Sequence, residues 1–202
     1  MPGTTEAELL CRARSGDRAA EEELGAKLSA PLRRYVARQV ADPFETDEIL
    51  QDCRLALHLN LHHIEGPGHL RPFVFRVARN LCFDGARRRE RRAEVWYVNA
   101  DDALLLAPAP ERPPEESVHW VLVWDEVRRA IDRLPEPHRE TILLLQEGLS
   151  HDEIAEVLRL PIGTVKSRVH NARKRIAQLL RPGTREALGI EGREEHDNAG
   201  TG

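Results

Sequence analysis

The chain has little of what a β-rich, secreted or membrane-spanning protein needs. Aromatic residues make up 4% of its 202 residues, and its three cysteines are Cys11, Cys53 and Cys82. An odd number of widely spaced cysteines indicates free thiols in a reducing compartment rather than a disulfide framework. No apolar run is long enough to cross a bilayer, and the acidic N-terminus lacks the apolar core of a secretory signal. These absences predict a cytoplasmic protein without membrane insertion.

Long stretches rich in Ala, Leu, Glu and Arg carry apolar residues at helical spacing, and alternating strand-like runs are nearly absent. The sequence therefore predicts an all-α fold. Four prolines between residues 108 and 114 forbid a helix there and predict a semi-stiff linker. We expect two small helical domains, over residues 1–92 and 117–181, joined by a Pro-rich linker over 93–116 and followed by a disordered tail over 182–202.

Punctuation by Gly, Pro and Asp predicts the helices of each domain. The N-terminal domain should contain helices over 4–14, 17–41, 45–61 and 70–90, with a break at 65–68. The C-terminal domain should begin with a helix that ends before Pro135, followed by a second helix that carries Ile142 to Leu145 and that Gly148 closes. The first of these two helices should bury one stripe made of Trp120, Trp124, Val127, Ile131 and Leu134.

The charge of the chain is unevenly distributed. The net charge is −4, yet residues 71–92 hold eight arginines against two acids, and residues 159–185 hold eight basic residues and no acid. Residues 93–117, between these segments, hold six acids and one arginine. This pattern indicates two anion-binding surfaces on an otherwise acidic carrier.

Residues 149–180 have the pattern of a helix-turn-helix. Ser150 and Glu153 have the spacing of a capping box, Gly163 is available for a left-handed turn, and Thr164 is expected to cap the second helix. The second helix should pack inward through Val165, Val169, Ala172, Ile176 and Leu179. Its other side carries the residue types that reach base edges and phosphates in a major groove: Lys166, Ser167, Arg168, His170, Asn171, Arg173 and Lys174. The alternative is a solvated basic face on an ordinary helical hairpin.

Two segments of the N-terminal domain also carry polar faces. Residues 45–57 expose an acidic face, which by itself suggests only solubility: Asp47, Glu48, Gln51 and Asp52. Residues 70–90 have an apolar stripe made of Leu70, Phe73, Val74, Val77, Ala78, Leu81 and Cys82. Their other side carries Arg76, Arg79, Asn80, Phe83 and Arg87. Cations with an interleaved aromatic suit single-stranded nucleic acid, and the alternative is a solvated Arg-rich helix with Phe83 buried.

Four segments in order resemble extracytoplasmic-function (group IV) sigma factors of bacterial RNA polymerase. They are DEILQDCRLAL, FVFRVARNLCFDGARRR, LPEPHRETILLL and LSHDEIAEVLRLPIGTVKSRVHNARKRI. The first two correspond to sigma region 2 and the last two to region 4. The resemblance implies a factor that binds core polymerase, reads the minus-10 and minus-35 elements of promoter DNA, and is commonly held inactive by an anti-sigma factor.

The resemblance also implies roles for individual residues. Asp47, Glu48, Gln51 and Asp52 would dock on the clamp helices of the largest polymerase subunit, and region 4 would pack against the polymerase flap. The loop over 62–69, with His62, His63 and His69, would capture a flipped minus-10 base. The strand-opening helix would use Arg76, Arg79, Asn80, Phe83, Asp84, Arg87 and Arg88, and the seven residues of the second C-terminal helix would read the minus-35 element. Phe73 stands where the family often has Trp, and Pro72 before it is expected to shorten the start of that helix.

The sequence thus predicts an alternative sigma factor that is not an enzyme and has no catalytic residue, cofactor or metal. A stand-alone helix-turn-helix regulator is the second interpretation, but it leaves the N-terminal motifs without a role. A zinc site built from Cys53, His58, His62, His63 and His69 is a third, and no carboxylate at a motif spacing supports it. Redox control through the cysteines is a fourth; Cys53 and Cys82 fall on predicted core faces, where thiols are usually inert.

Overall fold

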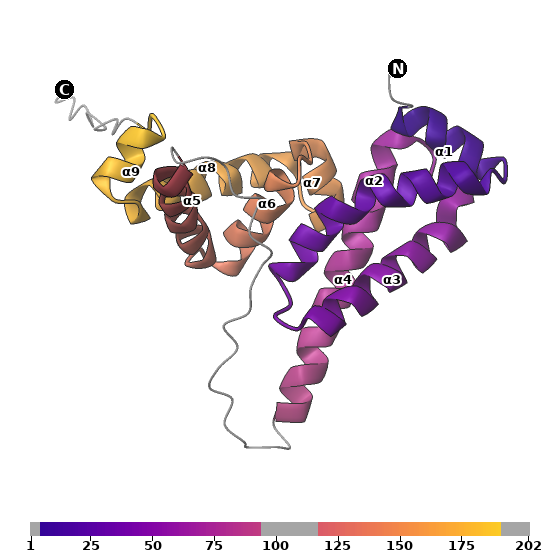
Figure 1. Cartoon of the computed structure of the whole chain (residues 1–202), viewed down its shortest axis with the longest axis horizontal. Helices are drawn as coiled ribbons and strands as arrows, with labels where there is room; N and C mark the ends of the chain where they lie inside the picture. Colours follow the sequence, from indigo (N-terminus) through magenta and orange to yellow (C-terminus); the bar gives the residue numbers. More distant parts are fainter. Residues whose placement is uncertain (1–4, 94–116, 191–202) are drawn as a thin grey trace, which may run out of the picture. The chain divides into compact units, whose positions relative to one another are not determined.

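The computed structural model describes residues 5–93 and 117–190, and these residues form helices and no β-strand (Figure 1). The N-terminal helices are α1 (Glu6–Arg14), α2 (Arg18–Ala37), α3 (Pro43–Asn60), the 3-10 helix η1 (Leu61–His63) and α4 (Pro67–Ala93). The C-terminal helices are α5 (Ser117–Asp132), α6 (Glu136–Gln146), α7 (His151–Leu158), α8 (Ile162–Leu179) and α9 (Pro182–Ala187). The prediction of an all-α fold is confirmed.

The chain divides into two compact units. The first comprises residues 1–109 and 143–166, and the second comprises residues 110–142 and 167–202. In the first unit α1 to α4 pack together and α7 packs on α4, whereas in the second unit α9 packs on α5. The predicted linker lies outside the described residues except for Ala93, and the division into two independent domains stays a prediction. No helix of the described part of the chain is long and apolar enough to span a membrane.

The core of the first unit forms around α4. Val74, Phe75 and Ala78 are at most 1% exposed, and the Phe75 ring meets the Tyr35 ring of α2 edge to face, with 5.5 Å between centroids. The predicted apolar stripe omitted Phe75 and included Phe73, Val77 and Leu81, which are only half-buried. Because α4 contacts α2, α3 and α7, its buried side is centred differently from the stripe that spacing alone suggests.

Neither of the two prolines of α4 interrupts or shortens the helix as predicted. The helix begins at Pro67, inside the segment predicted to break the chain, because proline suits the first turn of a helix, where backbone N–H groups have no intrahelical partner. Pro72 lies inside α4 and does not shorten it. Its missing N–H removes one backbone hydrogen bond from the second turn, and packing of the following apolar residues holds the helix.

The first turns of α5 are more exposed than predicted. Trp120 and Trp124 are 43% and 55% exposed, so the predicted stripe is wrong at both. The buried residues of this helix are Val123, Ala130 and Ile131, and Leu134 just beyond it is buried as well. Burial in α5 thus begins at Val123, and residues 119–122 before it are exposed. In α8, Val165, Val169 and Ala172 are buried as predicted, but Leu179 in the last turn is 40% exposed.

The turn between α7 and α8 is built differently from the prediction. Ser150 and Glu153 form the predicted capping box, with hydrogen bonds of 3.2 and 2.7 Å. The left-handed residue is Arg159, with φ of 53°, and its N–H donates to the carbonyl groups that end α7. Gly163 and Thr164 lie inside α8, which begins at Ile162, so the helix starts before the predicted cap. The Pro161 carbonyl accepts hydrogen bonds from the N–H groups of Thr164 and Val165.

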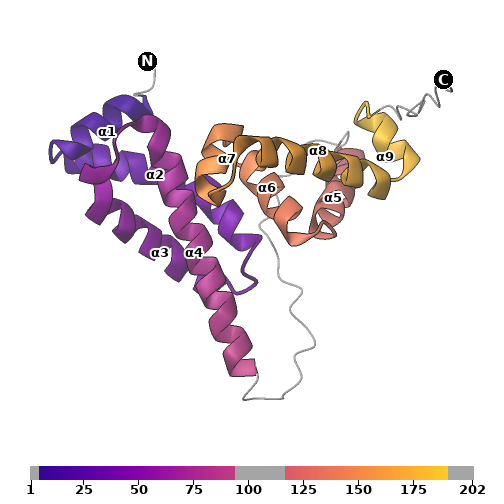
Figure 2. The same cartoon turned by 180° about the vertical axis from the view of Figure 1, so that it is seen from behind.

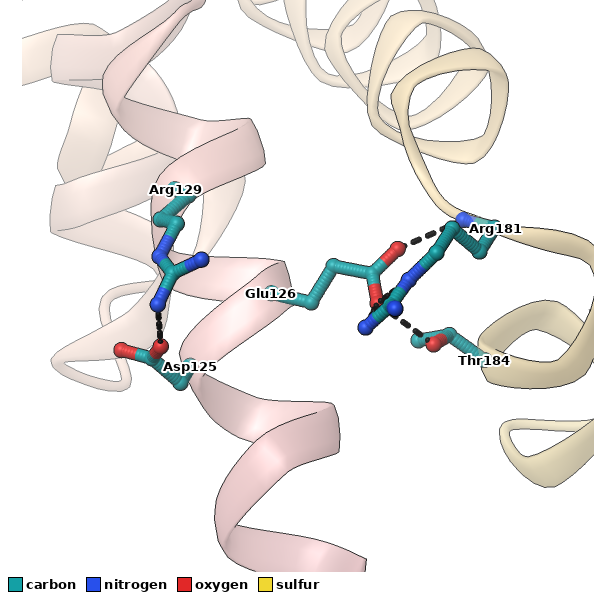
Figure 3. A network of polar contacts seen from close by, with 5 residues as sticks. All are labelled: Asp125, Glu126, Arg129, Arg181 and Thr184. Carbon is teal, nitrogen blue, oxygen red and sulfur yellow. Dashed lines mark hydrogen bonds and ion pairs between the residues drawn. The ribbon is translucent and has the colours of Figure 1, made fainter.

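A short helix follows α8 where a disordered tail was predicted. Glu126 of α5 accepts hydrogen bonds from the backbone N–H of Arg181 (2.6 Å), from its Nε (2.8 Å) and from the Thr184 hydroxyl (2.7 Å), as Figure 3 shows. Three charge-assisted bonds to one carboxylate fix the start of α9 against α5. The prediction of disorder is therefore wrong for residues 182–187, because the anchoring acid lies 55 residues earlier in the chain.

We predict that Glu126→Gln lowers stability at neutral pH and much less in acid. Hydrogen bonds from Arg181, and then from Thr184, lower the pKa of Glu126 from 4.5 to about 2. The stabilisation is therefore fully present above pH 4.5 and is lost as the pH falls toward 2. Urea midpoints of the variant and the unchanged chain should differ more at pH 7 than at pH 3. Glu186→Gln, an exposed acid in α9, should leave the midpoint unchanged at both pH values.

We predict that one cysteine reacts readily in the folded protein. Cys11 is exposed, whereas Cys53 and Cys82 are buried, and burial raises the pKa of each of these two thiols to about 12. Because the thiolate is the reactive form, alkylation at pH 8 followed by mass spectrometry should label Cys11 quickly and the other two only after unfolding. Rapid labelling of Cys53 in the native protein would contradict this burial and would revive a redox role.

Candidate nucleic-acid interface

The exposed side of α4 carries the cations predicted to meet single-stranded nucleic acid. Arg76, Asn80, Phe83 and Arg87 step by four, three and four residues, so they lie along one side of the helix. Asn80, Asp84, Arg87 and Arg88 are exposed, whereas Arg76, Arg79 and Phe83 are half-buried. The opposite side of α4 is buried in the core, which holds this polar side outward.

Two arginines on α4 lie over phenylalanine rings. The Arg79 guanidinium carbon is 4.7 Å from the centre of the Phe83 ring, and that of Arg76 is 6.0 Å from the centre of the Phe73 ring. Such cation–π contacts hold the guanidinium groups in place and keep ring faces next to positive charge. Bases of single strands stack on such faces while their phosphates pair with the cations. Phe83 is therefore neither fully buried nor isolated, which favours the nucleic-acid interpretation over the solvated helix.

The segment predicted as a base-capturing loop is shorter than expected. His62 and His63 lie in η1 and His69 lies in the first turn of α4, so only residues 64–66 stand between the two helices. All three histidines are exposed, and Ile64 between them is buried and anchors the segment. His63, His69, Phe73 and Arg76 line one hollow of about 180 Å³.

A carboxylate from α7 completes that hollow. Glu156 Oε2 lies 3.1 Å from His69 Nδ1, and its Oε1 lies 3.6 Å from Arg76 Nη1. Nearby, Glu147 Oε2 lies 2.8 Å from Arg34 Nη2, and the Glu147 carbonyl oxygen accepts a hydrogen bond from Arg71. These acids could not be predicted from the sequence, because their partners lie 76 to 113 residues away in the chain and no spacing rule connects such positions.

The acidic face of α3 is exposed as predicted, at Asp47, Glu48, Gln51 and Asp52. Asp47 pairs with Arg33 of α2, with 2.7 Å between Oδ1 and Nη2. Leu55 and Leu59 continue the same side of the helix and are 55% and 65% exposed. These two leucines add apolar area to the acidic side of α3, and their spacing in the sequence did not mark them as exposed.

Six of the seven predicted minus-35 residues are exposed on α8, and Arg168 is half-buried. The first turn of α8 holds no acid, so the positive end of the helix dipole adds to the basic side chains. Burial lowers the pKa of His138, and the charges of Arg175 and Arg168 lower it further. The charge of Arg168 thus acts on a residue of α6, and Arg168 is less exposed than the other six residues.

The alternative metal site is not assembled. The described residues contain no group of three or more His, Cys, Asp and Glu side chains that could hold a metal ion. His58 Nδ1 lies 2.7 Å from Glu21 Oε1, His69 faces Glu156, and Cys53 is buried in the core. Three of the five residues proposed for zinc, Cys53, His58 and His69, thus lie in different surroundings.

Two protein-family models match the chain, one in its N-terminal part and one in its C-terminal part. The model of Sigma-70 region 2 matches residues 26–92, and that of Sigma-70, region 4 matches residues 124–176. The chain is 30% identical over 185 residues to the RNA polymerase sigma-H factor of Pseudomonas aeruginosa, covering 89% of this chain and 96% of the relative. It is 29% identical to the ECF RNA polymerase sigma factor EcfG of Rhodopseudomonas palustris, covering 74% and 78% of the two chains.

Solved structures share the fold. The sigma factor RpoE in complex with the anti-sigma factor NepR, from Bartonella quintana, aligns with a TM-score of 0.62 at 23% identity, over 78% of this chain and 94% of that one. CnrH in complex with the cytosolic domain of CnrY aligns with a TM-score of 0.58 at 21% identity, over 86% and 96% of the two chains. At these identities the likeness concerns the fold alone.

Proposed function

Because the chain belongs to the sigma-70 family of RNA polymerase sigma factors, in its extracytoplasmic-function group, we propose that it binds core RNA polymerase and directs transcription initiation at specific promoters. The observation that carries the proposal is the order of the two matched regions. The first contains the basic segment over 71–92, and the second contains most of the basic segment over 159–185. The chain itself would perform no catalysis and would need no cofactor. It would act in the cytoplasm, where it meets the polymerase.

The α4 surface is proposed to hold the separated minus-10 strand. Removing a base from the stack costs a few kcal/mol, which binding of the extruded base and of its phosphates must offset. The hollow beside His63, His69 and Phe73 would receive the base. The exposed Asn80, Asp84, Arg87 and Arg88 and the two Arg–Phe pairs would follow the strand. Only the single strand exposes ring faces to stack, so this surface would favour melted DNA over duplex.

The α8 surface is proposed to read the minus-35 element as duplex. Lys166, Ser167, His170 and Asn171 come early and midway in the helix, where short polar groups reach base edges, and Arg173 and Lys174 follow where phosphates lie. Arg168 has a smaller part in this proposal than the sequence suggested, because it is half-buried.

The acidic side of α3 is proposed to dock on the clamp helices of the largest polymerase subunit. Glu48 and Asp52 would supply charge and Gln51 a hydrogen-bonding amide. Leu55 and Leu59 would supply apolar area to a partner with basic and apolar groups. The region 4 part would contact the polymerase flap, and an anti-sigma factor would hold the protein inactive by covering these surfaces. One structural neighbour is the sigma factor RpoE bound to the anti-sigma factor NepR, and the other is CnrH bound to the cytosolic domain of CnrY. The first of these complexes supports this part of the proposal.

We predict that promoter recognition depends on the exposed residues of α8. Run-off transcription with core polymerase and a library of genomic fragments should give discrete start sites only when the protein is present. Lys166→Ala and Arg173→Ala should each weaken promoter binding by about 1–3 kcal/mol, since each removes one base or phosphate contact. Arg14→Ala removes an exposed charge from α1 and should change nothing. Unchanged transcription in both α8 variants would contradict the minus-35 assignment.

We predict that Asp52→Lys weakens binding to core polymerase by at least about tenfold. The new lysine would face basic groups of the partner, and like charges placed next to each other in an interface cost several kcal/mol. Glu22→Lys makes the same charge reversal on an exposed position of α2 and serves as the control. Affinity can be measured by fluorescence anisotropy with the protein labelled at the exposed Cys11. Equal affinities of the two variants would remove α3 from the interface, and tight binding of promoter duplex without polymerase would favour a stand-alone regulator.

A further inference from the structure

The first turns of α5 carry an apolar patch on the surface of the second compact unit. Four of its residues are 43–59% exposed: Trp120, Val121, Leu122 and Trp124. Val123, which lies among them, is buried. A helix that is apolar on nearly every side is ordinarily covered, and exposed apolar patches mark surfaces that another segment contacts. The two tryptophans therefore indicate that a further segment packs on the start of α5.

The contact of α5 with α9 lies on another side of the helix. Within the second compact unit α9 packs on α5 (Figure 2), and the Glu126 carboxylate holds it through Arg181 and Thr184. Because two residues turn an α-helix by more than half a circle, Glu126 lies on nearly the opposite side from Trp124. Trp120 is four residues before Trp124 and shares its side of the helix. The side with the two tryptophans is therefore left for a segment other than α9.

The segment that precedes α5 has the pattern to cover this side. Its four prolines favour a polyproline II helix, in which residues three apart share a face. One such face is wholly apolar, and the other two carry Glu111 and Arg112. The residues of the apolar face are Leu104, Ala107, Pro110 and Pro113. Polyproline II segments bind surfaces lined by aromatic side chains, at low cost in conformational entropy because they are already stiff.

We propose that the linker folds back on α5, so that Pro110 and Pro113 pack on Trp124 and Trp120. Residues 110–116 and α5 belong to the same compact unit. Polyproline II rises about 3.1 Å per residue and an α-helix about 1.5 Å, so the two prolines are about 9 Å apart and the two tryptophans about 6 Å apart along their axes. A turn at residues 115–116 brings Pro113 beside Trp120 and Pro110 beside Trp124, and so short a loop costs little entropy to close.

This packing changes the reach of the linker. Its free part then ends at Pro110 instead of at Ser117, which removes seven residues, or roughly 20 Å of extended chain. In a sigma factor a shorter free linker narrows the range of distances between the two promoter elements that one molecule can contact together. The packing itself does not depend on the proposed function, because it involves only residues of this chain.

The test measures acrylamide quenching of tryptophan fluorescence in the full chain. The third tryptophan, Trp96, is replaced in every sample (Trp96→Phe), so that the signal comes from Trp120 and Trp124 alone. The double variant Pro110→Ser with Pro113→Ser should raise the quenching constant roughly twofold, because each flat ring regains access to quencher on a second face. The matched control is Pro108→Ser with Pro114→Ser, which removes two prolines from another face of the same segment and should leave the constant unchanged. Far-UV circular dichroism should be the same in both, since the substitutions precede α5.

A second measurement reports the contact itself. In nuclear magnetic resonance spectra the ring protons of Pro110 and Pro113 should be shifted upfield by the indole rings, and those of Pro108 and Pro114 should not. Replacing both indoles, Trp120→Leu with Trp124→Leu, keeps the helix apolar and should abolish the shifts. Proline shifts that are equal at all four positions, or that survive loss of both tryptophans, would overturn the proposal.

Two further outcomes would assign the patch to another occupant and would also overturn the proposal. Quenching that falls as the concentration of the protein rises, equally in both proline variants, would show that a second copy of the chain covers α5. Tryptophans that are as open in the isolated chain as in urea, and become protected only when core polymerase is added, would make the patch a polymerase contact. In either case the proposed function of the chain would stand, because only the occupant of the α5 patch would change.

Discussion

Burial of one side of α4 is the constraint on which the first compact unit depends. This helix packs on α2, α3 and α7, and Val74, Phe75 and Ala78 are excluded from water. Burying a side chain such as Phe75 contributes about 1.5–3 kcal/mol, so the helix cannot rotate about its axis without exposing several of them. Because neighbouring positions on a helix are fixed relative to one another, the same burial sets the direction of the arginines on the other side.

The arginines of α4 can pair with more than one kind of anion. A guanidinium group held over a phenylalanine ring can pair with a carboxylate of its own chain or with a phosphate. The chain is acidic as a whole, with 34 acids against 30 basic residues, so its own carboxylates are available to compete. The segregation of charge along the sequence therefore defines a set of possible internal partners as well as two nucleic-acid surfaces.

Local rules predicted much of the helical structure and failed where neighbours decide. The capping box at Ser150 and the buried positions Ile49, Cys53 and Val165 follow from spacing, because each depends on residues within one or two helical turns. Gly163 is the residue best suited to a left-handed turn, yet Arg159 adopts that conformation because its position ends α7. Pro72 is tolerated inside α4 because packing along a 27-residue helix compensates for one lost hydrogen bond.

The sequence by itself determined the helical class, the order of the two basic segments and the side of each helix that bears charge. Those properties depend on residue type and on a period of 3.6 residues, which can be read along the chain. Tertiary structure alone decided that Phe75 is central to the core, that Arg181 anchors α9 on Glu126, and that Glu156 meets His69 and Arg76. These contacts join residues that are tens of positions apart, and only the folded arrangement of the helices brings them within bonding distance.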